Sequence, residues 1–152
     1  MSFVSGSKYN PIFSKITVES KVETAKDTGK LGDYTVAIES ARLSKDYEGK
    51  PAVVVKYKFT NNGDKATSFM VAITNKAFQD GVELELAMVD STKDAKFNSG
   101  DGLKEIKKGA SLEVEEAYKL SNQKSKIEVE ANELVSMSSD KLSKTFDAAA
   151  LK

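Results

Sequence analysis

The sequence predicts an all-β protein, an antiparallel β-sandwich of seven or eight strands. Three observations lead to this prediction. Apolar and polar residues alternate in several short stretches. Turn-forming residues recur roughly every ten to fifteen positions, and no long stretch places apolar residues at helical spacing. A chain of 152 residues fits one domain around a single hydrophobic core.

The first half of the chain contains the most regular alternation. Residues 16–22 predict a first strand. Residues 34–43 predict a second strand in which the apolar parity changes near Ser40, so we expect a β-bulge there. A turn at 45–51 leads to the clearest strand, whose core-facing residues are Val53, Val55, Tyr57 and Phe59.

The second half continues with strands separated by glycine-containing turns. The stretch NNGD at 61–64 predicts a hairpin into a strand at 69–73 that is buried on both faces. Asp80-Gly81 predicts another hairpin turn. The strand after it has as its core-facing residues Val82, Leu84, Leu86 and Met88. Residues 112–120 and 127–131 predict the last two strands of the sandwich.

The ends of the chain lack this regular pattern. We therefore divide it into an N-terminal arm (1–14), the sandwich (15–135) and a C-terminal appendage (136–152). The arm is predicted to contact a protein partner, including a second copy of the chain, through five large apolar residues: Phe3, Val4, Tyr9, Ile12 and Phe13. The alternative is that the arm packs on its own sandwich or is disordered.

The appendage has two candidate structures. Ser139 or Asp140 is a candidate N-cap for a short helix in which Leu142 and Phe146 fall at helical spacing. A strand at 141–146 is the alternative.

The middle of the chain carries a specific order of motifs. DYEGKP at 46–51 precedes a β-branched strand that ends in TNN at 60–62, and FQDG follows at 78–81. Together with the stretch EIKKGASLEVEEAYKL, these motifs resemble an immunoglobulin-like domain-of-unknown-function family of Gram-positive bacteria, often found in surface lipoproteins. The resemblance covers roughly residues 31–133. It implies an immunoglobulin-like sandwich, and it supplies nothing for function because the family has no assigned catalytic residues to carry over. Neither a signal peptide nor a lipobox cysteine is evident before the domain, unlike the usual family setting.

The composition narrows the chemistry that we expect. The chain has no cysteine and no histidine, which argues against zinc sites, disulfides and thiol or imidazole catalysis. Arg42 is the only arginine and the formal net charge is zero, so we expect no nucleic-acid partner. No apolar run is long enough to span a membrane. We expect no enzyme activity, no cofactor and no metal.

Two acidic stretches are weak candidates for a metal site. QDGVELE at 79–85 lacks the spacing of a calcium loop, so we expect Glu83 and Glu85 to form the solvated face of a hairpin. The stretch at 90–102 contains four oxygen ligands without a recognised spacing, and we expect a disordered or partner-contacting loop there.

Glu116 is the most unusual candidate residue, because it falls on the apolar parity of its strand. An inward carboxylate needs a partner or has its pKa raised. A buried ion pair between Arg42 and Glu116 is one hypothesis; the other is that a bulge or the sandwich edge returns Glu116 to water.

These features predict a non-enzymatic structural or interaction protein. Our first hypothesis is a capsid-decorating or tail-associated subunit of a phage virion, assembled in the host cytoplasm. The alternative is a ligand- or partner-binding domain of a cell-surface protein or lipoprotein from a Gram-positive bacterium, and therefore extracytoplasmic. The partner is then a virion or cell-envelope component. A carboxylate-based enzyme is the least favoured alternative.

Overall fold

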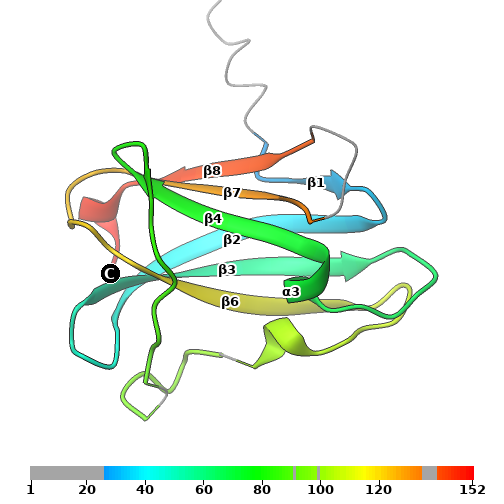
Figure 1. Ribbon diagram of the computed structural model, residues 1–152, viewed down its shortest axis with the longest axis horizontal. Helices are drawn as coiled ribbons and strands as arrows, with labels where there is room; N and C mark the ends of the chain where they lie inside the picture. Colours follow the sequence, from blue (N-terminus) through cyan, green and yellow to red (C-terminus); the bar gives the residue numbers. More distant parts are fainter. Residues whose placement is uncertain (1–25, 91, 99, 135–139) are drawn as a thin grey trace, which may run out of the picture.

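The computed structural model describes residues 26–90, 92–98, 100–134 and 140–152, which form two antiparallel four-stranded sheets (Figure 1). Sheet 1 contains, in spatial order, β1 (Thr28–Leu31), β2 (Tyr34–Lys45), β3 (Pro51–Asn61) and β6 (Ser111–Lys119). Sheet 2 contains β5 (Val82–Glu83), β4 (Ile73–Gln79), β7 (Ile127–Glu133) and β8 (Leu142–Phe146). Both sheets contribute to one hydrophobic cluster, so the predicted all-β sandwich is confirmed. Among the described residues, no helix is long and apolar enough to cross a membrane.

The strands of sheet 1 follow the predicted alternation closely. All four core-facing residues predicted in β3 are buried. The pairing of β2 with β3 shifts between Ile38 and Ser40, which confirms the predicted bulge. Ala52 and Val54 on the outer face of β3 are buried as well. Part of this outer face is covered by the loop at 92–98, which is held there by contacts of Asp94 and Asn98 to side chains of β2 and β6.

The predicted hairpin at 61–64 is wrong, because β3 and β4 lie in different sheets. The side chain of Asn61 is buried, and its Nδ2 donates to the carbonyls of Lys65 and Ile106. These bonds direct the chain away from sheet 1. The predicted strand at 69–73 is replaced by a single helical turn, α3 (Phe69–Ala72), before β4 begins. Only Phe69 and Ala72 of that turn are buried, three positions apart, as on one face of a helix.

The hairpin turn at Asp80-Gly81 is confirmed between β4 and β5, and both residues have positive φ. The strand predicted after it is largely wrong. Leu84 is buried, but Val82 is 63%, Leu86 57% and Met88 73% exposed. The chain leaves sheet 2 after Glu83 and crosses to the edge of β6. The alternating apolar residues of this segment therefore do not share one buried face.

The C-terminal region belongs to the sandwich. Residues predicted as a helix form β8, which pairs with β7, so the alternative strand is correct. A short 3-10 helix, η2 (Ala148–Ala150), follows, and Leu142 and Ala148 join the core. The sandwich thus extends beyond the boundary predicted at residue 135. The predicted strand at 16–22 and the arm residues Phe3, Val4, Tyr9, Ile12 and Phe13 lie outside the described residues.

Candidate functional site at the open side of the sandwich

Glu116 projects toward the space between the two sheets, on the same face of β6 as the buried Val114 and Tyr118. Because β6 is the edge strand of sheet 1, this position lies at the side of the sandwich. The carboxyl is half-buried. It lies beside Gly102, where an added Cβ would approach Glu116 Oε2 to 3.3 Å and Met70 Cγ to 3.1 Å. The predicted inward parity of Glu116 is therefore correct.

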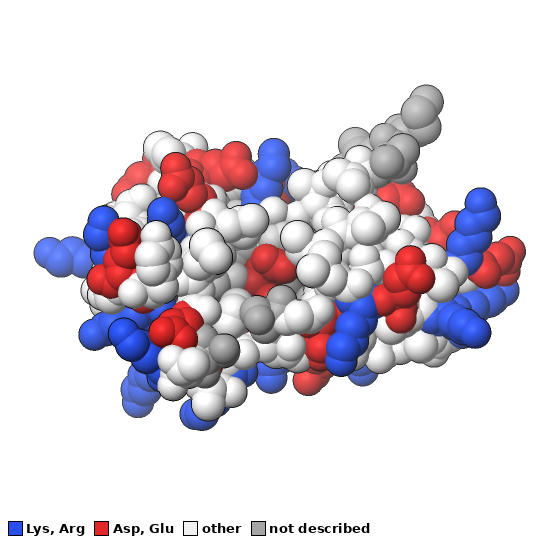
Figure 2. Space-filling view, turned by 60° about the horizontal axis from the view of Figure 1, so that its bottom comes forward, with Lys and Arg blue, Asp and Glu red and all other residues white. Residues whose placement is uncertain are grey.

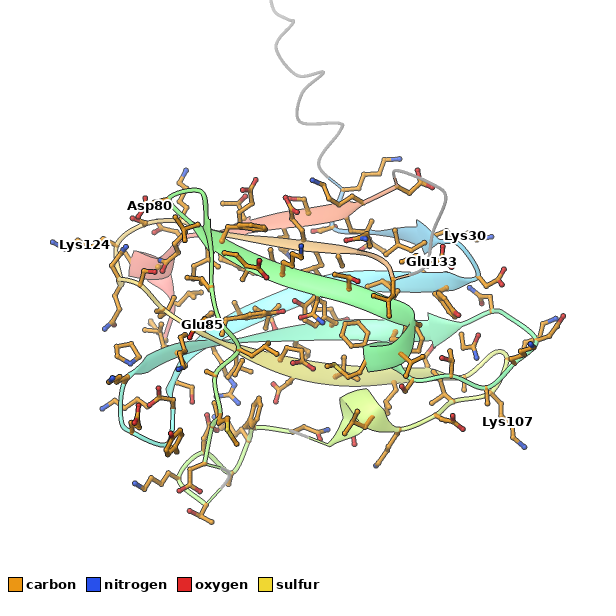
Figure 3. The ribbon with its side chains drawn as sticks, viewed as in Figure 1. Lys30, Asp80, Glu85, Lys107, Lys124 and Glu133 are labelled. Carbon is orange, nitrogen blue, oxygen red and sulfur yellow. The ribbon has the colours of Figure 1, made fainter. Side chains whose placement is uncertain are left out.

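A cleft of about 310 Å³ opens beside Glu116, where the segment after β5 crosses from sheet 2 to the edge of β6 in sheet 1. Figure 3 labels Glu85 on this segment. Its apolar wall consists of Met70, Ile73, Leu84, Leu86 and Leu134. Its charged lining consists of Lys76, Glu83, Glu85 and Glu116. In Figure 2, acidic atoms are recessed between uncharged side chains on the face that has been turned forward.

Burial raises the pKa of the Glu116 carboxyl to about 7. No lysine or arginine among the described residues forms an ion pair with it. At neutral pH the carboxyl is therefore divided between its protonated and ionised forms. A cation placed in the cleft would favour the ionised form.

A chain of hydrogen bonds lies next to Glu116. The hydroxyls of Tyr57 and Tyr118 are 2.5 Å apart, and the Tyr118 hydroxyl donates to Asn75 Oδ1. Desolvation raises the pKa of both tyrosines, so both hydroxyls stay protonated at neutral pH. Tyr57 was predicted to face the core and Tyr118 lies in the strand predicted at 112–120, but the sequence pattern gave neither of them a polar role. Asn75 was not identified, although its parity with Ile73 and Ala77 is a signal that could have found it.

The predicted pair between Arg42 and Glu116 is not formed. Arg42 has the parity of Val54 and Ala117 in the sheet register, whereas Glu116 has the parity of Val55. The two side chains therefore lie on opposite faces of sheet 1. Arg42 Nη1 instead lies 2.7 Å from Asp94 Oδ2, and its Nη2 lies 3.8 Å from Glu115 Oε1.

The two acidic stretches considered as metal sites have other partners. Glu83 and Glu85 are exposed, as predicted, although they also line the rim of the cleft. In the 90–102 loop, Asp94 binds Arg42, while Asp101 contacts Lys104. Within the described ranges, no three acidic side chains are grouped as a metal site would require.

The sequence motifs that are most distinctive have structural roles. Asp46 Oδ1 accepts from the backbone N–H groups of Glu48 and Lys50 and closes the β2–β3 turn. Asn61 Nδ2 fixes the path of the chain after β3 by donating to the carbonyls of Lys65 and Ile106. Gln79 joins the β4–β5 turn to the loop between β6 and β7. The motifs therefore stabilise turns and leave the cleft as the candidate site.

The structure thus defines a β-sandwich domain whose open side carries an acidic, apolar-walled cleft. The profile of Domain of unknown function (DUF5067) matches residues 14–133, and the chain belongs to this family. No curated protein matches the chain.

Two solved structures share the fold. A predicted lipoprotein from Staphylococcus aureus subsp. aureus NCTC 8325 aligns with a TM-score of 0.64 and 18% identity, covering 82% of this chain and 90% of that one. The yjhA protein from Bacillus subtilis aligns with a TM-score of 0.55 and 11% identity, covering 81% of this chain and 98% of that one. At these identities the likeness concerns the fold alone.

Proposed function

We propose that this chain is a non-enzymatic, partner-binding domain of a bacterial cell-surface protein. We further propose that its cleft holds a lysine or arginine side chain of a protein partner. The observation that carries this proposal is an inward carboxyl, Glu116, at an accessible cleft with no cationic partner among the described residues.

The charges around the cleft favour a cationic ligand. Three carboxylates, from Glu83, Glu85 and Glu116, line it against the single ammonium group of Lys76. Glu85 also lies 3.6 Å from Lys119, but both side chains are largely exposed, so that pair is weak. A cation next to Glu116 would gain more electrostatic stabilisation than one next to Glu85, because the half-buried carboxyl of Glu116 is less well solvated.

The apolar wall favours a cation that is carried on an aliphatic stem. Leu86 and Leu134 line the cleft and remain 57% and 52% exposed. Lysine and arginine bury their methylene groups along apolar surface while their charged ends reach polar partners. A partner side chain of this kind would therefore cover both leucines and neutralise Glu116.

The described residues offer little for catalysis. In the cleft, the Tyr118 hydroxyl already donates to Asn75, and the chain has no histidine or cysteine that could supply an imidazole base or a thiol nucleophile. This supports the assignment as a binding domain.

The strand order supports the immunoglobulin-like assignment. In such sandwiches, strands A, B and E share one sheet, and C, F and G share the other. Equating β2, β3 and β6 with A, B and E, and β4, β7 and β8 with C, F and G, reproduces these neighbours. Domains of this class bind through loops and exposed edges, and the cleft lies at such an edge.

The comparisons support the cell-surface alternative better than the virion hypothesis. One structural relative is described as a predicted lipoprotein, and both come from Gram-positive bacteria. Neither is described as a virion component. Fractionation of producing cells tests this location, and recovery with phage particles would favour the virion hypothesis instead.

Titration of the isotopically labelled full chain with short peptides tests the cleft. N-acetyl-Leu-Lys-Leu amide should shift the backbone amide signals of Leu86 and Tyr118 at pH 8. Peptides with norleucine or glutamate in place of lysine should not. Lowering the pH to 5.5 should weaken lysine-peptide binding by up to roughly 30-fold, because only the ionised carboxyl attracts the cation.

Two variants make this test specific. Glu116→Gln should abolish the preference for the lysine peptide and its dependence on pH. Glu128→Gln removes an exposed carboxylate from β7, outside the cleft, and should change neither. Equal binding of the lysine and glutamate peptides, or unchanged binding by Glu116→Gln, would overturn the proposal.

A further inference from the structure

The edge of sheet 2 beside the cleft is only partly paired. β5 pairs with β4 at two residues of β4, Phe78 and Gln79. One further main-chain bond follows, from the Leu84 N–H to the Ala77 carbonyl at 2.7 Å. Along the described ranges of the chain, no other segment pairs with this edge of β4. The first half of β4 therefore has an open edge.

The edge is open because the chain after Leu84 joins the other sheet. The Ala87 N–H donates to the Ala117 carbonyl of β6 at 2.9 Å, and Leu86 forms a bridge with Tyr118. Figure 1 shows this segment running away from β4 toward β6. The cleft lies in the resulting gap and is lined by Asn75 of β4 and by Leu86.

The main chain of Asn75 points to this open edge. Along an antiparallel strand, alternate residues direct their N–H and C=O groups to the same neighbour. Ala77 directs its carbonyl to Leu84, so Asn75, two positions earlier, directs both of its main-chain groups to the same side. Among the described residues, no main-chain group bonds to either of them at this edge. Unpaired main-chain groups at a sheet edge are the site at which a further strand can be added.

A strand added here would turn two of its side chains into the cleft. Residues directly opposite each other in an antiparallel pair have their side chains on the same face of the sheet. Ile73 is buried in the core, and the Asn75 side chain accepts from the hydroxyl of Tyr118. The residues opposite Ile73 and Asn75, which are two positions apart, would therefore both point inward.

The position opposite Ile73 is the one that faces the carboxyl of the cleft. An added Cβ on Gly102 would lie 3.1 Å from Met70 Cγ and 3.3 Å from Glu116 Oε2, so Met70 and Glu116 are neighbours. Met70 precedes Ile73 by three residues, which places Glu116 toward the start of β4. A cationic side chain is therefore favoured at this position.

The position opposite Asn75 faces an apolar surface. Leu86 forms its bridge with Tyr118, the residue whose hydroxyl donates to Asn75, and it is 57% exposed. Leu84 lines the same part of the cleft. An apolar side chain opposite Asn75 would cover the exposed part of Leu86.

We propose that the protein partner binds as an extended segment that adds to the open edge of β4, antiparallel to it as β5 is. An apolar residue lies opposite Asn75, and a lysine or arginine lies two positions later, opposite Ile73. The residue opposite Asn75 donates its N–H to the Asn75 carbonyl and accepts from the Asn75 N–H. This inference rests on the proposed function of the cleft and adds that the partner is recognised through its main chain.

The spacing of the two side chains is tested by titrating the labelled full chain at pH 8. N-acetyl-Thr-Leu-Thr-Lys-Thr amide has leucine and lysine on one face of an extended segment. Its isomer N-acetyl-Thr-Thr-Leu-Lys-Thr amide has them on opposite faces. The first peptide should bind about fivefold more tightly, because only it buries leucine while lysine reaches Glu116.

Methylation of single peptide nitrogens tests the main-chain pairing. In the first peptide, N-methylation of leucine removes the donor to the Asn75 carbonyl and should weaken binding about tenfold. N-methylation of the central threonine is the matched control, because that nitrogen faces away from β4, and it should have little effect. A saturating amount of the unmethylated peptide should slow deuterium exchange of the Asn75 amide but not of Thr145, which is exposed on β8 at the other edge of sheet 2.

These results separate strand addition from the cleft itself. Equal weakening by the two methylated peptides, or unchanged exchange at Asn75, would overturn strand addition, while a preference for lysine that Glu116→Gln removes would still support the cleft. Failure of every lysine peptide to bind would overturn both. Sedimentation of the full chain tests the remaining occupant: dimers that the first peptide dissociates would overturn the assignment to a separate partner and assign the edge to a second copy.

Discussion

Gln79 and Glu116 are polar side chains at inward-facing positions of neighbouring parts of the sandwich, and their surroundings are opposite. Gln79 is 1% exposed. Its Nε2 donates to the carbonyls of Asn122 and Ser125, and its Oε1 accepts from the backbone of Ser121 and Asn122. Glu116 has no such partner among the described residues, and its carboxyl faces an accessible cleft.

The difference separates a structural polar group from a candidate binding group. Gln79 uses its full hydrogen-bonding capacity within the chain, so nothing remains for a ligand. Figure 3 labels Asp80 and Lys124 on the two loops that Gln79 connects. Glu116 retains its capacity, and burial raises its pKa to about 7 because no partner compensates the lost solvation. The unused hydrogen-bonding capacity of Glu116 thus identifies the cleft as the candidate binding site.

The largest expected effect is at Gln79. Gln79→Ala should lower the free energy of unfolding by about 4 kcal/mol, because it leaves buried loop groups unpaired and opens a cavity. Urea unfolding measures this loss. Gln123→Ala, at an exposed position in the same loop, should change stability by less than about 0.5 kcal/mol. Similar values for the two variants would contradict the structural role of Gln79.

Substitution of Glu116 should change the free energy of unfolding in the opposite direction. Its pKa rises from 4.5 to about 7 on folding, so the folded state binds more protons and stability falls as the pH rises between these values. Glu116→Gln should therefore be more stable than the wild type by about 2 kcal/mol at pH 8, after allowance for solvent screening. The two proteins should be equal near pH 4. Urea unfolding at both pH values checks this, and a destabilised variant at pH 8 would mean that Glu116 has a hidden partner.

Tyr118 tests whether the hydrogen-bond chain beside the cleft is structural. Tyr118→Phe removes the donor to Asn75 and the partner of the Tyr57 hydroxyl. We expect the free energy of unfolding to fall by about 1.5 kcal/mol. The pH dependence attributed to Glu116 should remain, because desolvation rather than Tyr118 causes it. Its loss in the variant would assign the raised pKa to the tyrosine instead.

The smallest expected effect is at the turn beside Gln79. Gly81 has a φ of 79°, and a Cβ there would meet no atom within 4 Å. Gly81→Ala should therefore cost only the strain of the left-handed conformation, about 1 kcal/mol. Gly100→Ala is the control, since Gly100 has a φ of −100° and equally open space. Thermal unfolding compares the two, and equal melting temperatures would show that the turn tolerates a side chain.

The sequence by itself determined the features that depend on neighbouring residues. Period-two alternation identified the core face of β3 and the inward parity of Glu116, because side chains alternate along any strand. Asp80-Gly81 predicted its turn because a two-residue hairpin turn needs positive φ at both central residues, and Asp-Gly is a pair that adopts these values readily. The parity change near Ser40 predicted the bulge because an extra residue in one strand shifts the alternation of the side chains that follow.

Only the tertiary structure decided which strands are neighbours and which side chains meet. The NNGD stretch has the local chemistry of a hairpin, yet the buried Asn61 binds carbonyls as distant as that of Ile106 and sends the chain to the other sheet. Leu86 alternates as a core residue would, but it is exposed because the chain has left sheet 2. Arg42 meets Asp94, 52 positions away, because a loop folds over the outer face of sheet 1. Contacts between distant segments follow from the packing of the whole chain, which no short stretch encodes.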